Sequence, residues 1–394
     1  MTAPRGESGR PLLLFLSDIP WDSLYQRPQH LALRLARRRP VLWLEPATLG
    51  HRVRWKPEEA APGVFVLSVP MLPHHARSRL LRRTAWAAGS IPLLRTLLEG
   101  VRRASLRRSL GRFPFAASVE GILVENFQLY HLTRLFPQAP AIFDYIDDAF
   151  GFAPFPPYVH RLWEQAAGGC GAVSVTSEEL ASRVAQVRRR GIHIIPNGVE
   201  YERFAHPEPA PRPGDLPPGE HPIAGYVGSV SPWFDFHLLA QASERFPLAR
   251  FVVIGPVHPE AASGARKSTL GGNVFFLGRK PYRDIPGYLR HFRAGIIPFR
   301  RTRLTEAVNP VKLYEYAAAG LPAVSTLFSD GLLRFQDILR VARDGEAFLE
   351  SLGEILREGC PPDEARRLRA FAEANDWEAR TLEVEKLLAG GPER

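Results

Sequence analysis

Cysteine, methionine and lysine are scarce in this chain of 394 residues. It has two cysteines, two methionines and only five lysines, against 46 arginines. Cys170 and Cys360 lie far apart in the sequence and show no metal-ligand or redox spacing, so neither a disulfide framework nor a zinc site is indicated. We expect both cysteines to be buried and inert.

Long apolar runs and common nucleotide-binding motifs are also missing. No segment has the roughly 18 unbroken apolar residues that a membrane-spanning helix needs, and the apolar run Leu12 to Leu16 is too short for a signal peptide. The patterns G-x-G-x-x-G after a first strand and G-x-x-x-x-G-K-[ST] are absent, which disfavours dehydrogenases and kinases. We therefore expect a cytoplasmic protein, soluble or peripheral to a membrane.

Short apolar runs alternate with helix-like stretches in two series. The first series is 11–17, 40–46, 63–69, 120–125, 140–146 and 172–176, and the second is 223–228, 250–255, 273–277, 294–299 and 322–326. Strands alternating with helices predict parallel sheets covered on both faces, and the chain length suits two domains. The fold class is therefore α/β, with two doubly wound Rossmann-like domains facing an interdomain cleft, where ligands of such folds bind.

The expected domain boundaries follow from the segment between the two series. Residues 204–221 contain six prolines and no apolar periodicity, which is typical of a linker or hinge. We thus predict an N-terminal acceptor-side domain at 1–203, a hinge at 204–221 and a donor domain at 222–374. A C-terminal helix at 375–394 is predicted to pack back toward the N-terminal domain.

Positive charge is concentrated in residues 77–112, which hold ten arginines and one acid, Glu99, a net charge of +9 out of +10 for the chain. Leucines and Trp86 are interspersed with these arginines, a mixture typical of basic amphipathic helices on an anionic membrane. The alternative is an exposed helical pair with a solvated basic face. Nucleic acid is disfavoured as a partner, because no zinc-finger or aromatic RNA-binding signature accompanies the arginines.

Residues 309–322, NPVKLYEYAAAGLP, predict a well-delimited helix. Asn309 can cap it, proline suits its first position, and Gly-x-Pro ends it. Lys312 and Glu315 are three residues apart and therefore share a face near the positive helix end. Lys312 and the free amides suit a diphosphate, and Glu315 can accept hydrogen bonds from ribose hydroxyls. The alternative is a surface salt bridge between these two side chains.

The segment NPVKLYEYAAAGLPAVST resembles the donor-binding helix and following strand of the retaining glycosyltransferases of family four, which have the GT-B fold of two Rossmann domains. The resemblance extends to the subset that has an N-terminal W-D-x-x-x-Q-R-P element. It runs from about residue 11 to 388 and is carried by WDSLYQRPQH (21–30), FDYIDDAFGF (143–152), VTSEEL (175–180), IIPNGVEYERF (194–204) and GYVGSVSPWFDFHLL (225–239).

The resemblance implies a metal-independent glycosyltransferase that uses a nucleotide-diphosphate sugar as co-substrate and needs no cofactor. It implies donor-binding roles for Gly228, Ser229, Lys312 and Glu315, and we predict further donor contacts for Arg279, Lys280 and Asn309. The sequence departs from the family at Ala307, where a second glutamate is usual, with Glu306 one place away, and at Ser229, where arginine is common. Arg279 and Lys280 are candidates for the missing positive charge; a solvated turn is the alternative.

Polar residues follow two strands of the N-terminal half, at ends that should face the cleft. We predict catalytic roles for Asp18 and Arg27 beside Lys312, and acceptor contacts for Trp21, Gln29, Asp147 and Asp148. Helix capping or packing is the alternative for Asp18 and Trp21, and the Asn197-Gly198-Val199 segment is expected to turn the chain into the hinge. Asp144, Asp147 and Asp148 lack D-x-D spacing, so no metal is predicted.

The resemblance also implies a mechanism. The acceptor hydroxyl would attack on the face from which the diphosphate leaves, with retention, and the phosphate itself would take the proton. The partners would be a nucleotide sugar and a glycan, glycolipid or small-molecule acceptor, at the inner face of the cell membrane if the basic segment binds lipid. The alternatives are a catalytically silent nucleotide-sugar or glycan-binding protein, and a phosphorylase or epimerase of the same fold.

Overall fold

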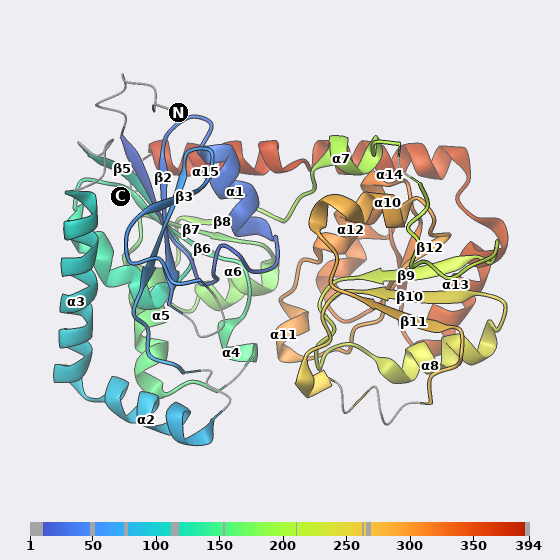
Figure 1. Cartoon of the computed structure of the whole chain (residues 1–394), viewed down its shortest axis with the longest axis horizontal. Coiled ribbons are helices and arrows are strands. Elements are labelled where there is room, and N and C mark those ends of the chain that lie inside the picture. Colours follow the sequence, from blue (N-terminus) through green and yellow to red (C-terminus); the bar gives the residue numbers. More distant parts are fainter. Residues whose placement is uncertain are drawn as a thin grey trace. The chain divides into compact units, whose positions relative to one another are not determined.

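The structure is a computed structural model that describes residues 11–47, 52–74, 78–111, 118–152, 154–209, 211–261, 264 and 269–390. The chain divides into two compact units, residues 1–196 with 380–394 and residues 197–379. Each unit is built on its own sheet with helices around it (Figure 1). Because the chain passes between the units at residues 196 and 197, the described part of the Pro-rich segment 204–221 belongs to the second unit and is not a hinge between the two.

The described part of the first unit contains an eight-stranded sheet with the order β3-β4-β2-β1-β5-β6-β7-β8. Its strands are β1 Leu12–Leu16, β2 Val41–Pro46, β3 Glu58–Ala61, β4 Val64–Val69, β5 Val119–Val124, β6 Ala141–Tyr145, β7 Ala172–Val175 and β8 Ile192–Ile194. Only the β3–β4 pair of this described sheet is antiparallel. The five residues of β1 are fully buried, as expected for a central strand of a sheet covered on both faces.

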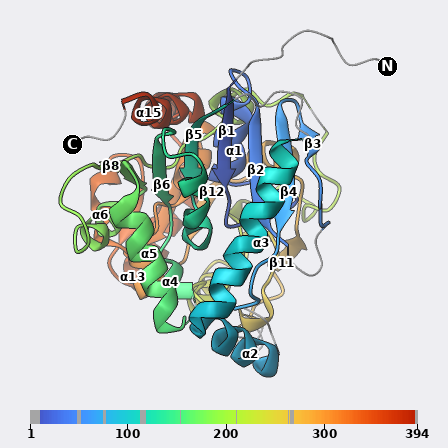
Figure 2. The same ribbon diagram turned by 90° about the vertical axis from the view of Figure 1, so that its left-hand side faces the viewer.

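Helices cover both faces of this sheet (Figure 2). They are α1 Arg27–Leu35, α2 Arg79–Ser90, α3 Pro92–Leu110, the 3₁₀ helix η1 Phe127–Leu135, α4 Ala149–Phe152, α5 Pro157–Gly169 and α6 Glu178–Val184. The C-terminal helix α15, Trp377–Gly390, begins in the second unit, and its residues from 380 onward belong to the first. There Val384 and Leu388 pack in the same hydrophobic core as Phe15 and Trp43. The rings of Phe15 and Trp43 stack with centroids 4.6 Å apart.

The described part of the second unit contains a six-stranded, parallel sheet with the order β11-β10-β9-β12-β13-β14. Its strands are β9 Ile223–Val227, β10 Arg250–Ile254, β11 Val274–Gly278, β12 Ala294–Ile297, β13 Ala323–Thr326 and β14 Arg340–Ala342. Its helices are α7 Tyr201–Ala205, α8 Phe236–Arg245, η2 Tyr282–Asp284, α10 Ile285–Leu289, α11 Arg303–Glu306, α12 Val311–Ala318, η3 Asp330–Phe335, α13 Gly345–Glu358 and α14 Pro362–Ala374. Helix α13 packs on β12 to β14, and α12 packs on α7 and α14.

The strands predicted from the apolar runs are all present. Three described strands were not predicted, β3, β8 and β14, and each lies at an edge of its sheet. Their sequences, EEAA, IHI and RVA, are only three or four residues long and so give no run of apolar residues, and edge strands are often this short. Cys170 is buried as expected, but Cys360 is only half-buried. Among the described helices, none is both long and apolar enough to cross a membrane.

Candidate functional site

The second sheet reverses its strand order beside β9. From this strand the chain proceeds through β10 to β11 on one side, and β12 to β14 fill the other. In open α/β sheets, ligands bind at such a switch point, outside the carboxyl ends of the strands. Gly228 follows β9 there, with a φ of +150°, and its amide donates to the Ile254 carbonyl at 2.8 Å.

Two glycines allow a close approach of backbone at this edge. Gly255 follows β10 with a φ of +142°, and a Cβ atom on it would lie 2.0 Å from the Gly228 carbonyl oxygen. A Cβ on Gly228 would in turn lie 2.4 Å from Cε of Lys312. The turn after β9 and the first turn of α12 therefore meet, and the lysine amine lies at the switch point. The sequence predicted a donor-binding role for both residues but not their contact.

Glu315 lies one turn further along α12 and is buried rather than at the surface. Burial raises the pKa of the Glu315 carboxyl to about 7. The positive charge of Lys312 and the nearby Tyr282 hydroxyl lower this pKa, and the negative charge of Glu200 raises it. The site thus pairs a half-buried cation with a carboxyl group that changes its charge near neutral pH.

Asn309 does not cap α12, contrary to the prediction. Pro310 is the N-cap residue, and the Asn309 amide oxygen instead accepts hydrogen bonds from the Asn197 backbone at 2.8 Å and from the Tyr314 hydroxyl at 3.1 Å. The Asn197 side chain returns a hydrogen bond to the Asn309 carbonyl at 2.8 Å. Asn309 therefore joins the first residues of the second unit to α12. The predicted end of the helix is confirmed, since Gly320 follows it with a φ of +67°.

The other predicted donor residues of the second unit have local partners. The Ser229 carbonyl accepts a hydrogen bond from the Tyr226 hydroxyl at 2.8 Å. Lys280 forms an ion pair of 2.5 Å with Asp215, which also accepts a hydrogen bond from Tyr288 at 2.9 Å. The charge of Lys280 is therefore already balanced by the Pro-rich segment. Arg279 lies beside it, just after Gly278 ends β11.

Ala307 stands where a glutamate is usual in the family that the sequence resembles. Ala307 is fully buried, and its neighbour Glu306 forms an ion pair of 2.9 Å with Arg301. Arg301 also binds Asp330 in a bidentate manner, at 2.9 and 3.0 Å. Glu306 is thus held by an arginine.

In the first unit, Arg27 is a buried structural residue. Its guanidinium forms a bidentate pair with Asp144 at 2.9 and 3.0 Å, and it donates to the carbonyl oxygens of Ile195 and Pro196, each at 3.0 Å. This network holds α1 against β6 and the end of the first unit. The predicted catalytic role of Arg27 is therefore not supported by its position, because its donors are used inside the unit.

Gln29 and Asp148 also have structural roles. Gln29 is 1% exposed; its amide oxygen accepts from the Gln26 backbone, and its amide nitrogen donates to the Leu24 carbonyl at 3.2 Å. Asp148 is fully buried and forms an ion pair with Arg183. Acceptor contacts by these two side chains were predicted because they follow strand ends, but strand ends also need side chains that satisfy loop amides.

The remaining predicted residues of the first unit keep accessible surface. Asp18 is exposed just after β1, and Asp147 is half-buried just after β6. The Trp21 ring packs edge-on against Trp43, with centroids 5.1 Å apart, and its backbone amide donates to Glu45 at 2.7 Å. Trp21 therefore has the packing role named as its alternative.

Glu125 is a potential site residue that the sequence did not reveal. It follows β5, which lies beside β1 where the strand order of the first sheet reverses. The side chain is 7% exposed; one carboxyl oxygen accepts from the Ser17 hydroxyl at 3.5 Å, and the other has no hydrogen-bond partner among the described residues. Burial raises its pKa well above the ordinary value, and the charge of Asp144 adds to that shift. No motif surrounds Glu125 in the sequence, so only the topology singles it out.

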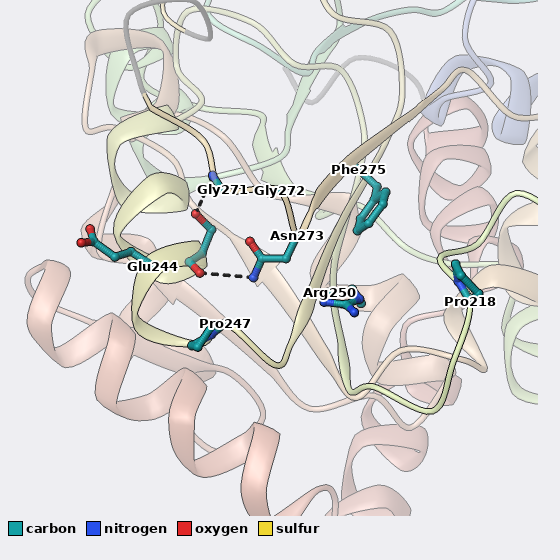
Figure 3. A pocket seen from close by; sticks show the side chains of 9 residues that line it. Pro218, Glu244, Pro247, Arg250, Gly271, Gly272, Asn273 and Phe275 are labelled. Atoms are coloured by element: carbon teal, nitrogen blue, oxygen red, sulfur yellow. Dashed lines mark hydrogen bonds between the residues drawn. The ribbon is translucent and has the colours of Figure 1, made fainter.

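A surface pocket of about 600 Å³ lies elsewhere on the second unit (Figure 3). It is lined by Arg250 and Asn273, which lie at the amino ends of β10 and β11, opposite to the switch-point edge. The Asn273 amide nitrogen is used by the carbonyl oxygens of Ser243, Phe246 and Ala249. The pocket lies away from the switch-point edge and is not the candidate site. Among the described residues, no cluster of three His, Cys, Asp or Glu side chains could hold a metal ion.

Comparison with known sequences relates the second unit to glycosyltransferases. Residues 221–358 match the family model described as Glycosyl transferases group 1. A protein named as a teichuronic acid biosynthesis glycosyltransferase, TuaH of Bacillus subtilis (strain 168), is 31% identical over 138 residues, 35% of this chain and 35% of that protein. The UDP-glucuronate:glycolipid 2-beta-glucuronosyltransferase of Xanthomonas campestris pv. campestris is 29% identical over 169 residues, 42% of this chain and 38% of that protein. The chain spans little more than a third of the length of these relatives.

Solved structures match nearly the whole chain. Sucrose-phosphate synthase from Thermosynechococcus elongatus has a TM-score of 0.71 at 17% identity, over 97% of this chain and 99% of that one. WaaG, a glycosyltransferase involved in lipopolysaccharide biosynthesis, has a TM-score of 0.63 at 16% identity, over 96% and 100%. The chain has the GT-B fold. Within this GT-B chain, Gly228, Lys312 and Glu315 all lie in the segment that matches the family model.

Proposed function

We propose that this protein is a glycosyltransferase that moves a sugar from a nucleotide-diphosphate sugar to a hydroxyl group of an acceptor. The observation that carries the proposal is the convergence of Lys312 and Gly228 at the switch point of the second sheet, with buried Glu315 one turn away. That convergence lies inside residues 221–358, the segment similar to Glycosyl transferases group 1.

Each residue of this cluster has a role in the proposed reaction. Lys312 and the first amides of α12 stabilise the negative charge that develops on the leaving diphosphate, as a cation at a helix N-terminus can. The carboxylate of Glu315 accepts hydrogen bonds from the two ribose hydroxyls. Because Gly228 has no side chain, the turn after β9 leaves room for the diphosphate to contact Lys312. No cofactor or metal is part of the proposal.

We propose retention at the anomeric carbon, with the leaving phosphate taking the acceptor proton. The competing outcome is inversion, and a β-linked product is named for the Xanthomonas relative. An NMR time course of the product's anomeric proton distinguishes the two. Early appearance of the anomer opposite to that of the donor would overturn retention without touching the donor site.

The relatives' names guide the choice of donor and acceptor to test. One names UDP-glucuronate and a glycolipid, and another names teichuronic acid biosynthesis. We propose a lipid-linked or polysaccharide acceptor, and UDP as the first nucleotide to test. The proposed location is the cytoplasm, at the inner face of the cell membrane. Besides the nucleotide sugar and the acceptor, we propose an anionic membrane surface as a partner, which would contact residues 77–112. The ends of that segment, Arg77 and Arg112, lie outside the described residues.

The second candidate function is nucleotide-sugar binding without catalysis. It is favoured by Ala307, which is buried where a glutamate is usual, and by Glu306, which is held by Arg301. Turnover distinguishes the two functions, since a silent binding protein would bind the nucleotide sugar and release no sugar to water or to any acceptor.

Calorimetric titration of UDP, GDP and dTDP tests the donor site. The wild type should bind one of the three nucleotides with saturation, and Glu315→Ala should weaken binding by about 1–3 kcal/mol through loss of a charged hydrogen-bonding group. Glu350→Ala, an exposed position of α13 in the same unit, is the matched control and should bind like the wild type. Absence of binding by all three nucleotides would remove the basis of the proposal.

A further inference from the structure

Helices α2 and α3 of the first unit expose an unusual number of large apolar side chains. In Figure 2, α3 runs along the face of the unit toward the viewer, and α2 continues from its lower end. Seven of the seventeen exposed large apolar residues of the described chain lie between residues 80 and 101. They are Leu80 (71% exposed), Leu81, Ile91, Leu93 (68%), Leu94, Leu97 (57%) and Val101 (55%). We call these residues the α2–α3 apolar surface.

The inner face of these helices fixes their orientation. Arg102 is buried and donates to the carbonyl oxygens of Pro70 at 2.8 Å and Gln128 at 3.5 Å. Leu106 is fully buried on the same side, and a Cβ on Gly89 of α2 would clash with Tyr158 at 1.8 Å. The apolar residues of the opposite face therefore point outward because the inner face is already packed.

The outward face of α3 has a regular pattern. Leu93, Leu97 and Val101 are four residues apart and form one stripe along the helix. Arg107 and Arg108 are exposed beyond the end of that stripe, and Arg79 and Arg83 are exposed on α2. Glu99 is the one acid among residues 78–111, and it is half-buried. The surface thus combines an apolar stripe with positive charge at both ends and no exposed negative charge.

We propose that the α2–α3 apolar surface docks onto an anionic lipid bilayer. Leu93, Leu97 and Val101 enter the boundary between head groups and acyl chains, and the four exposed arginines contact lipid phosphates. A bilayer fits better than a protein partner because it offers both an apolar layer and a continuous sheet of negative charge at a fixed depth. The proposal does not depend on the transferase activity.

Sedimentation of the full-length protein with vesicles tests the proposal. The protein should bind vesicles of phosphatidylcholine containing phosphatidylglycerol and should bind pure phosphatidylcholine vesicles far more weakly. Added salt should weaken the binding, because it screens the attraction between the arginines and the lipid phosphates. Equal binding to the two vesicle types, or no binding to either at low salt, would overturn the proposal.

Two sets of variants locate the contact. Leu93→Ser/Leu97→Ser/Val101→Ser should lower the partition coefficient at least about tenfold, since inserted apolar area drives binding. Arg107→Gln/Arg108→Gln should lower it on the order of 25-fold, at about fivefold for each arginine near an anionic surface, and should flatten its salt dependence. Leu248→Ser, an equally exposed leucine of the second unit (72%), is the matched control and should leave binding unchanged.

Three further readouts keep the result interpretable. All substituted side chains are exposed, so the thermal unfolding temperature of each variant should equal that of the wild type. Nucleotide binding is measured on the same preparations, so a failed donor site is seen separately from a failed membrane contact. Light scattering without lipid should show a monomer; a dimer that the triple serine variant dissolves would assign the surface to a second copy of the chain instead.

Discussion

The Lys312 side chain occupies the space that a side chain at position 228 would fill, at the carboxyl edge of the second sheet. A Cβ atom on residue 228 would lie 2.8 Å from the Lys312 amine nitrogen and 2.9 Å from the Tyr226 hydroxyl. The residue also has a φ of +150°, which side chains rarely adopt. Glycine at position 228 is therefore required both by the backbone and by the lysine that lies over it.

Gly228→Ala should therefore displace Lys312 and weaken nucleotide binding about as much as Lys312→Ala does. The strained backbone should also lower the free energy of unfolding by more than about 1 kcal/mol. Titration calorimetry and urea unfolding measure the two effects. Gly287→Ala is the control, because Gly287 lies in α10 with nothing near its would-be Cβ; that variant should keep both affinity and stability. Unimpaired binding by Gly228→Ala would show that Lys312 does not need its present position.

Glu315 should make nucleotide affinity dependent on pH. Ribose hydroxyls donate to the ionised carboxylate, so binding favours the charged form. With a pKa raised to about 7 by burial in the free protein, the charged fraction and hence the affinity should fall about tenfold from pH 8 to pH 6. Titrations at several pH values measure this, and Glu315→Gln should bind more weakly and almost independently of pH. An unchanged pH dependence in that variant would assign the effect to another group.

The periodicity of apolar residues predicted most of the fold. The buried strands were predicted because central parallel strands such as β1 are almost wholly apolar, and residues 309–322 predicted α12 because they combine a turn-forming start with Gly320 at the end. The short edge strands lacked this signal. The sequence predicted that Lys312 and Gly228 both bind the donor, but not that they are in contact. The two residues are 84 positions apart, and no local pattern indicates how close they lie in space.

The sequence was a poorer guide to which strand-end residues are accessible. Arg27, Gln29 and Asp148 have the same polar character as Asp18, yet the first three are buried in hydrogen-bond networks. A polar side chain after a strand can serve a ligand or the neighbouring loop, and the sequence pattern is the same in both cases. Glu125 illustrates the opposite error, because its position at a switch point depends on the order of strands β1 and β5 in space.

Glu125 should make the stability of the first unit depend on pH. Its pKa is raised well above the ordinary value by burial, so its folded state favours the protonated form. The stability is therefore complete at low pH and is lost as the pH rises through the raised pKa. Glu125→Gln removes this loss, so the variant should unfold at a higher temperature than the wild type at pH 8, with a smaller difference at pH 5. Thermal melts of Glu164→Gln, an exposed glutamate of the same unit, should follow the wild type at both pH values.

Arg27→Lys separates a structural from a catalytic role for Arg27. Lysine cannot reproduce the bidentate contact with Asp144 together with the hydrogen bonds to Ile195 and Pro196. Loss of a hydrogen bond to a charged group costs about 1.5–3 kcal/mol, so the free energy of unfolding measured in urea should fall by at least about that amount. Asp144→Asn should have a similar effect, and the double variant should cost less than the sum because the two residues share one interaction. Turnover per folded molecule should stay close to that of the wild type. Lost turnover in an Arg27→Lys protein of unchanged stability would instead place Arg27 in the reaction.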